Sequence, residues 1–223
     1  MAGIWMEGRS TLREVFSLLK AETWDCGWLI TDLECYDYEG WEGCEKWAES
    51  RLFLTNRQLL HDVELRDMQF IWGTFSALPA GCTEAEALAA GLPAFELNDR
   101  KESIYLSDTL LPQNSLAFLE ISVEDSSSAT VVSADPALLR SLYGLPEWTE
   151  DAEKKNRRFH QMRALAEALI EELGWGGMNA FARRNLYGLL WRALYDHRPD
   201  RPVREEDVRA AYLELWKERK HHA

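Results

Sequence analysis

Apolar residues near the start of the chain recur at the spacing of an amphipathic helix. Thr11 and Glu14 have the spacing of a capping box. Behind them, four apolar side chains repeat at intervals of three and four: Leu12, Val15, Phe16 and Leu19. This pattern predicts a helix over residues 10–21. The next segment, WLITDLECY (28–36), alternates with a period of two. It predicts a strand with one mostly apolar face, made of Leu29, Thr31, Leu33 and Cys35.

Further strands and short helices are predicted between residues 68 and 144. Residues 68–79 are rich in aromatic and β-branched side chains and end at a proline, as strands do. Residues 83–91 begin with a Thr-x-x-Glu capping box and end at a glycine, which indicates a short helix. Residues 115–134 read as two β-rich runs joined by DSSS, which favours a hairpin. Asp135 and Pro136 then open a helix that ends before Gly144.

The residue composition of the sequence changes after Pro146. β-branched runs stop, and alanine, leucine, glutamate and arginine dominate three segments of helical periodicity: residues 149–173, 179–195 and 204–220. We therefore expect an α+β fold in which a mixed, largely antiparallel sheet with flanking helices is followed by a small C-terminal helical module. The predicted modules are 1–148, an acidic α/β module, and 149–223, a three-helix module.

The charge distribution supports the same division. The net charge is −13, but residues 1–150 carry 26 acidic and 10 basic side chains, whereas residues 151–223 carry 12 and 15. A module with a net charge of −16 repels nucleic acid and attracts basic partners. Arginines of the second module could contact phosphate, but glutamates are interleaved with them and no helix-turn-helix pattern is present. Nucleic acid is therefore not an expected partner.

Composition indicates a soluble cytoplasmic protein. The chain is 46% hydrophobic, which is enough for a sizeable core, and it has neither a signal-peptide pattern nor an apolar run of membrane-spanning length. Cys26, Cys35 and Cys44 are nine residues apart, with Cys82 further on, whereas zinc ligands lie two to four residues apart. We expect four reduced thiols and no metal, no cofactor and no membrane association.

Two segments carry a resemblance to a known family. These are QFIWGTFSALPAG (69–81) and SLAFLEISVEDSSSATVVSADPALLRSLYG (115–144), the latter reading as a strand, an Asp-Ser turn, a strand and a closing helix. On these pieces, residues 24–145 resemble an uncharacterised bacterial family, a domain of unknown function. That family begins with a helix and a tryptophan-containing strand. The resemblance covers roughly half of the chain and implies no activity.

Functional side chains are most concentrated in residues 24–50, which hold four tryptophans, three cysteines and eight carboxylates. Trp24 and Trp28 adjoin the predicted strand and are expected in the core. The charged connection that follows is the predicted binding surface, with six candidate residues: Asp37, Glu39, Trp41, Glu42, Glu45 and Trp47. Aromatic rings among charges are typical of recognition surfaces. Two interpretations stay open, because Trp41 and Trp47 could contact a partner or could pin their own loop.

No P-loop, nucleophile elbow, zinc-protease or dinucleotide motif is present in the sequence. The leading hypothesis is therefore a non-enzymatic bacterial protein-interaction module, of immunity or adaptor type, whose acidic surface binds a basic protein. The alternative is a small ligand-binding or hydrolase-like domain that uses Asp32, Glu34 and His61. A carboxylate pair beside a histidine can transfer protons if the three side chains meet in a concave site. The sequence indicates no oligomeric state.

Overall fold

The computed structural model describes residues 3–7, 12–36, 44–65, 68–94, 110–124, 128–144, 149–173, 178–195, 198 and 200–221. It divides the chain into two compact units, Met1–Glu153 and Lys154–Ala223. The predicted α+β class is confirmed, since an antiparallel sheet in the first unit is followed by helices in the second. No helix within the described residues is both long and apolar enough to span a bilayer.

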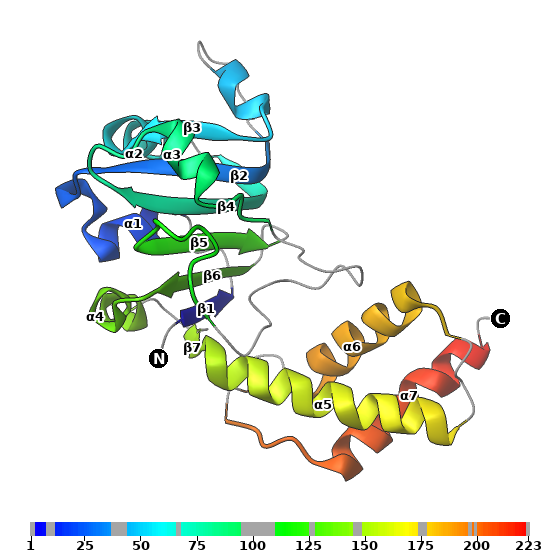
Figure 1. Cartoon of the computed structure of the whole chain (residues 1–223). Helices are drawn as coiled ribbons and strands as arrows, with labels where there is room; N and C mark the ends of the chain where they lie inside the picture. The colour runs from blue at the N-terminus through cyan, green and yellow to red at the C-terminus, as the bar shows by residue number, and fades with distance from the viewer. Residues whose placement is uncertain are drawn as a thin grey trace. The chain divides into compact units, whose positions relative to one another are not determined.

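The first unit is built on a sheet that has seven strands within the described residues. Their order is β3-β2-β4-β5-β6-β1-β7, and every neighbouring pair is antiparallel (Figure 1). The strands are β1 (Gly3–Glu7), β2 (Cys26–Tyr36), β3 (Leu52–Thr55), β4 (Gln69–Pro79), β5 (Leu119–Glu124), β6 (Ser128–Ser133) and β7 (Thr149–Asp151). β7 pairs with β1, so residues 149–151, predicted to begin the helical module, belong instead to the sheet of the first unit.

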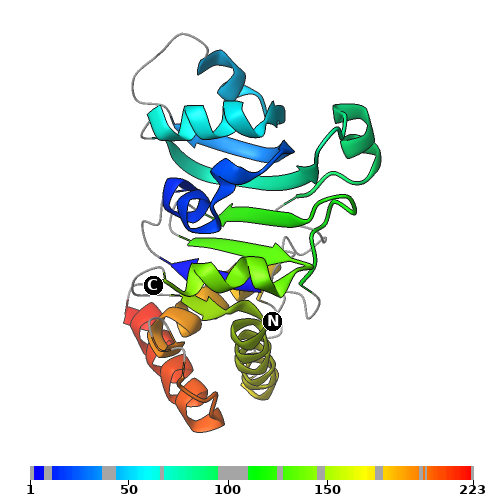
Figure 2. The same cartoon turned by 90° about the vertical axis from the view of Figure 1, so that its left-hand side faces the viewer.

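Helices cover one face of this sheet and bury the main core. Figure 2 shows α1 (Leu12–Leu19), α2 (Asn56–Leu65) and α4 (Pro136–Leu139) on the same face. The core beneath them includes Phe16, Trp28, Leu59, Phe75 and Ile121. Shorter elements complete the unit: the 3₁₀ helices η1 (Ala21–Thr23), η2 (Cys44–Ala48) and η4 (Arg140–Gly144), and the α-helix α3 (Glu84–Ala89).

The predicted apolar face of β2 is wrong, and a β-bulge is the reason. Thr31 pairs with Thr74 and Glu34 with Trp72, so Asp32 and Leu33 together lie opposite Gly73. Asp32 adopts a left-handed conformation with φ of 52°, which aspartate tolerates better than most residues. The bulge shifts the alternation by one residue. Trp28 and Ile30 before the bulge, and Leu33 and Cys35 after it, therefore join one core, whereas Leu29 packs in a separate cluster.

Among its described residues, the second unit has three helices, as the periodicity predicted: α5 (Ala152–Glu172, whose first two residues belong to the first unit), α6 (Ala180–Tyr195) and α7 (Glu205–His221). Their shared core includes Met162, Ile170, Leu190, Val208 and Tyr212. An ion pair of 2.6 Å between Arg209 and Glu172 links α7 to α5.

Candidate functional site

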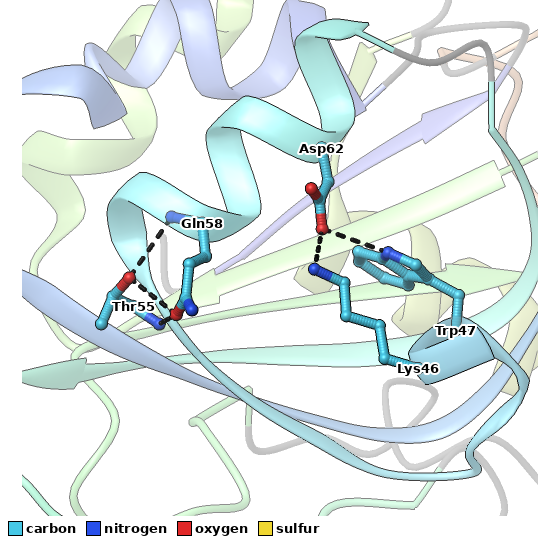
Figure 3. Close-up of polar contacts among 5 residues, drawn as sticks. All are labelled: Lys46, Trp47, Thr55, Gln58 and Asp62. Atoms are coloured by element: carbon cyan, nitrogen blue, oxygen red, sulfur yellow. Dashed lines mark hydrogen bonds and ion pairs between the residues drawn. The ribbon is translucent and has the colours of Figure 1, made fainter. Parts of the chain in front are cut away.

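A buried carboxylate on α2 anchors the 3₁₀ helix η2 (Figure 3). Asp62 is only 5% exposed and accepts a hydrogen bond of 3.2 Å from the indole nitrogen of Trp47. The Lys46 ammonium forms an ion pair with the same carboxylate oxygen. The Trp47 ring is 3% exposed and packs edge-to-face on Phe70 with 5.7 Å between ring centroids. Together these contacts attach η2 firmly to the helical face of the sheet.

The helix that presents Asp62 begins with a capping box. The Thr55 amide donates to the Gln58 side chain at 2.9 Å, and the Gln58 amide donates back to the Thr55 hydroxyl at 3.3 Å (Figure 3). This reciprocal pair fixes the first turn of α2. The Thr-x-x-Gln spacing was visible in the sequence and is the signal from which α2, for which no helix was predicted, could have been found.

The outer half of β2 lies beside the end of η2. The amide of Leu33 donates to the carbonyl of Ser50 at 3.2 Å, and the Cys35 thiol lies 3.5 Å from the carbonyl oxygen of Trp47. Both segments carry exposed carboxylates near this junction. We call these residues the acidic surface, and they are Asp32, Glu34, Glu45 and Glu49.

The exposed charged side chains of these two segments are mostly acidic. Lys46 is the cation within η2, and its ammonium is held by Asp62, so its charge is already compensated. Arg51 follows Ser50 and is exposed. Tyr36, at the end of β2, is 54% exposed and adds a large aromatic side chain to the same end of the strand. The two segments thus carry four exposed carboxylates and an exposed ring around a junction that these hydrogen bonds hold.

The predicted binding residues have different outcomes. Glu45 is exposed, as a contact residue must be. Trp47 is buried and hydrogen-bonded to Asp62, which favours the second of the two open interpretations, in which its ring pins its own segment. Asp37, Glu39, Trp41 and Glu42 lie outside the described residues.

The alternative site does not assemble in one concavity. His61 is exposed on α2 and lines a hollow of about 760 Å³ beside the start of β2, together with Trp24, Arg57, Glu64 and other residues. Neither Asp32 nor Glu34 lines this hollow. The three side chains therefore do not form the proton-transfer site that the alternative requires.

Thiol chemistry is also disfavoured at the same hollow. Burial, with a contribution from Asp25, raises the pKa of Cys26 to about 12, which keeps the thiol protonated at neutral pH. Cys26, Cys35 and Cys82 are in the thiol form and take part in no disulfide bond. Within the described part of the chain, no three His, Cys, Asp or Glu side chains are placed to hold a metal ion.

Comparisons of the chain with protein-family models, with curated proteins and with solved structures found no match. The resemblance of residues 24–145 to a domain of unknown function therefore stays a prediction.

Proposed function

We propose that the first unit is a non-enzymatic protein-interaction module, of immunity or adaptor type, whose acidic surface binds a basic protein partner. The observation that carries this proposal is that two carboxylate-bearing segments, β2 and η2, are hydrogen-bonded to each other, while a buried contact anchors η2 to α2. The hydrogen bond from Leu33 to Ser50 and the attachment of Trp47 to Asp62 fix the backbone that bears the carboxylates before any partner arrives.

A fixed charged surface is well suited to recognition. Charged groups on the rim of an interface raise the association rate and select partners of opposite charge. When these groups sit on a rigid backbone, less conformational entropy is lost on binding than with a mobile loop. Binding through the acidic surface should therefore be fast and should weaken as salt screens the charges over about 8 Å at physiological ionic strength.

Two features of the site argue against catalysis as the main role. The buried Cys26 is a protonated thiol and hence a poor nucleophile. His61 lines a hollow that neither Asp32 nor Glu34 lines. The histidine therefore does not meet these two carboxylates in that hollow to transfer protons.

The proposal is tested with two variants of equal charge. The site variant combines Glu34→Gln, Glu45→Gln and Glu49→Gln. The control variant combines Glu22→Gln, Glu64→Gln and Glu84→Gln, which are exposed carboxylates elsewhere on the first unit. Wild type and both variants are used to capture proteins from extracts of the native cell, and the captured proteins are quantified by mass spectrometry.

We expect wild type and control to enrich the same basic protein, and the site variant to bind it about tenfold more weakly, because three rim charges are lost. Raising the salt concentration should reduce capture by the wild type. Equal capture by the two variants would show that the acidic surface is not the binding site.

A further inference from the structure

Four polar residues form a continuous row across the sheet. Thr31 on β2 lies opposite Thr74 on β4, Thr74 lies opposite Ser122 on β5, and Ser122 lies opposite Thr130 on β6. We call these residues the hydroxyl row. All four are buried, with exposed fractions of 4% for Thr31, 2% for Thr130 and 0% for the two central residues.

The hydroxyl row lies on the face of the sheet that points away from the main core. Successive side chains in a strand point to opposite faces. The sequence neighbours of the row, Ile30, Phe75, Ile121 and Val131, belong to the main core, so the hydroxyls point the other way. A buried sheet face is normally apolar, because burying a hydroxyl without a hydrogen bond is unfavourable.

The two outer residues of the hydroxyl row are hydrogen-bonded. Thr31 donates to the carbonyl of Pro93 at 2.6 Å, and Thr130 donates to the Glu124 carboxylate at 3.4 Å. The neighbouring cross-strand pair on the same face is also hydrogen-bonded, since Ser76 on β4 donates to Glu120 on β5 at 2.9 Å.

The two central hydroxyls differ from their neighbours. Throughout the part of the chain that the structure describes, the hydroxyls of Thr74 and Ser122 have no hydrogen-bond partner, although both residues are fully buried. Buried hydroxyls in native proteins are almost always hydrogen-bonded, to protein, to ordered water or to a ligand. Two such groups at directly opposed positions indicate one shared partner.

We propose that Thr74 and Ser122 together bind one small, neutral group that both donates and accepts hydrogen bonds. Side chains directly opposite each other in an antiparallel pair have Cβ atoms about 5 Å apart, so a single oxygen can bridge the two hydroxyls. The group is neutral, because the flanking Glu120 and Glu124 carboxylates disfavour an anion and already accept hydrogen bonds from Ser76 and Thr130. An ordered water and the hydroxyl of a small molecule share this chemistry. The inference does not depend on the proposed function.

The experiment compares Thr74→Val, Ser122→Ala and the double variant with wild type, and uses Thr74→Ser as the matched control that keeps the hydroxyl. If the two hydroxyls hold a common group, each apolar variant should lower Tm by about 2–4 °C. The double variant should lose little more than one single variant, because either substitution breaks the bridge.

The bound group is detected directly in the wild type and in Thr74→Ser, which keeps the test valid if an apolar variant fails to fold. Nuclear Overhauser contacts between a long-lived water and the amides of residues 74 and 122 would identify water. An adduct in native mass spectrometry, absent from Thr74→Val, would identify a small hydroxylated molecule. Either signal supports the proposal. Absence of both signals in the wild type would overturn it, as would apolar variants that are as stable as wild type or more stable.

Discussion

Removing the Asp62 carboxylate should detach η2 from α2 and destabilise the first unit. In Asp62→Ala, the indole N–H of Trp47, on a side chain only 3% exposed, loses its hydrogen-bond acceptor. A buried donor left without a partner costs about 1–3 kcal/mol. The Lys46 side chain is 34% exposed, so the loss of its ion pair adds no more than about 1 kcal/mol. We expect a total loss of about 1–4 kcal/mol.

A double-mutant cycle separates the hydrogen bond from the rest of this loss. Trp47→Phe keeps an aromatic ring on Phe70 but removes the N–H group. If the hydrogen bond is the main contribution, the double variant should be little less stable than Asp62→Ala alone. The corresponding coupling energy is about 1 kcal/mol or more.

Unfolding in urea, followed by far-UV circular dichroism, gives the free energies for the cycle. Hydrogen exchange measured by mass spectrometry then locates the effect, because local opening of η2 exposes the amides of residues 44–50 and of the outer half of β2. The reasoning is refuted if Asp62→Ala lies within about 0.5 kcal/mol of wild type and exchange in these segments is unchanged.

Two further predictions concern buried groups of the first unit. Glu120 is fully buried and accepts hydrogen bonds from Ser76 and from the amides of Gln113 and Asn114, so Glu120→Ala leaves donors without an acceptor and should cost about 1–3 kcal/mol for each of them that stays unpaired, measured in thermal or chemical unfolding, and Glu120→Gln should cost less. Burial raises the pKa of Cys26 from 9.0 to about 12, so the folded state retains its proton longer than the unfolded state does. Stability should then fall as pH rises from about 9 to 12, and Cys26→Ala, compared with wild type over this range, should show a shallower fall.

Elements with a local signal were predictable from the sequence. The Thr83 capping box of α3 is present with both of its hydrogen bonds, and Asp135 caps α4 as expected. The hairpin of β5 and β6 also forms with the expected pairing. In contrast, the short strands β1, β3 and β7 were not predicted, because three to five residues carry little periodicity and their pairing depends on partners elsewhere in the chain.

The candidate site was only partly predictable, for two physical reasons. Trp47 stands among charges in the sequence, but its burial depends on Asp62, which lies fifteen residues later on α2. The exposure of Asp32 and Glu34 depends on a bulge opposite Gly73, which no simple period of two can indicate. Glu45 was predicted as a binding residue, whereas Asp32 and Glu34 were assigned to the alternative site with His61. The hydrogen bonds that bring β2 beside η2 follow from the tertiary structure.

Site-specific photo-crosslinking in the native cell tests the central claim most directly. A photoreactive amino acid is placed at Glu45 or Glu49 on the acidic surface and, as the control, at Glu84 on α3, since all three positions are exposed. The proposed function predicts a discrete crosslink to one basic protein from positions 45 and 49 and none from position 84. Crosslinks from position 84 to the same protein, or no discrete product from positions 45 and 49, would contradict it.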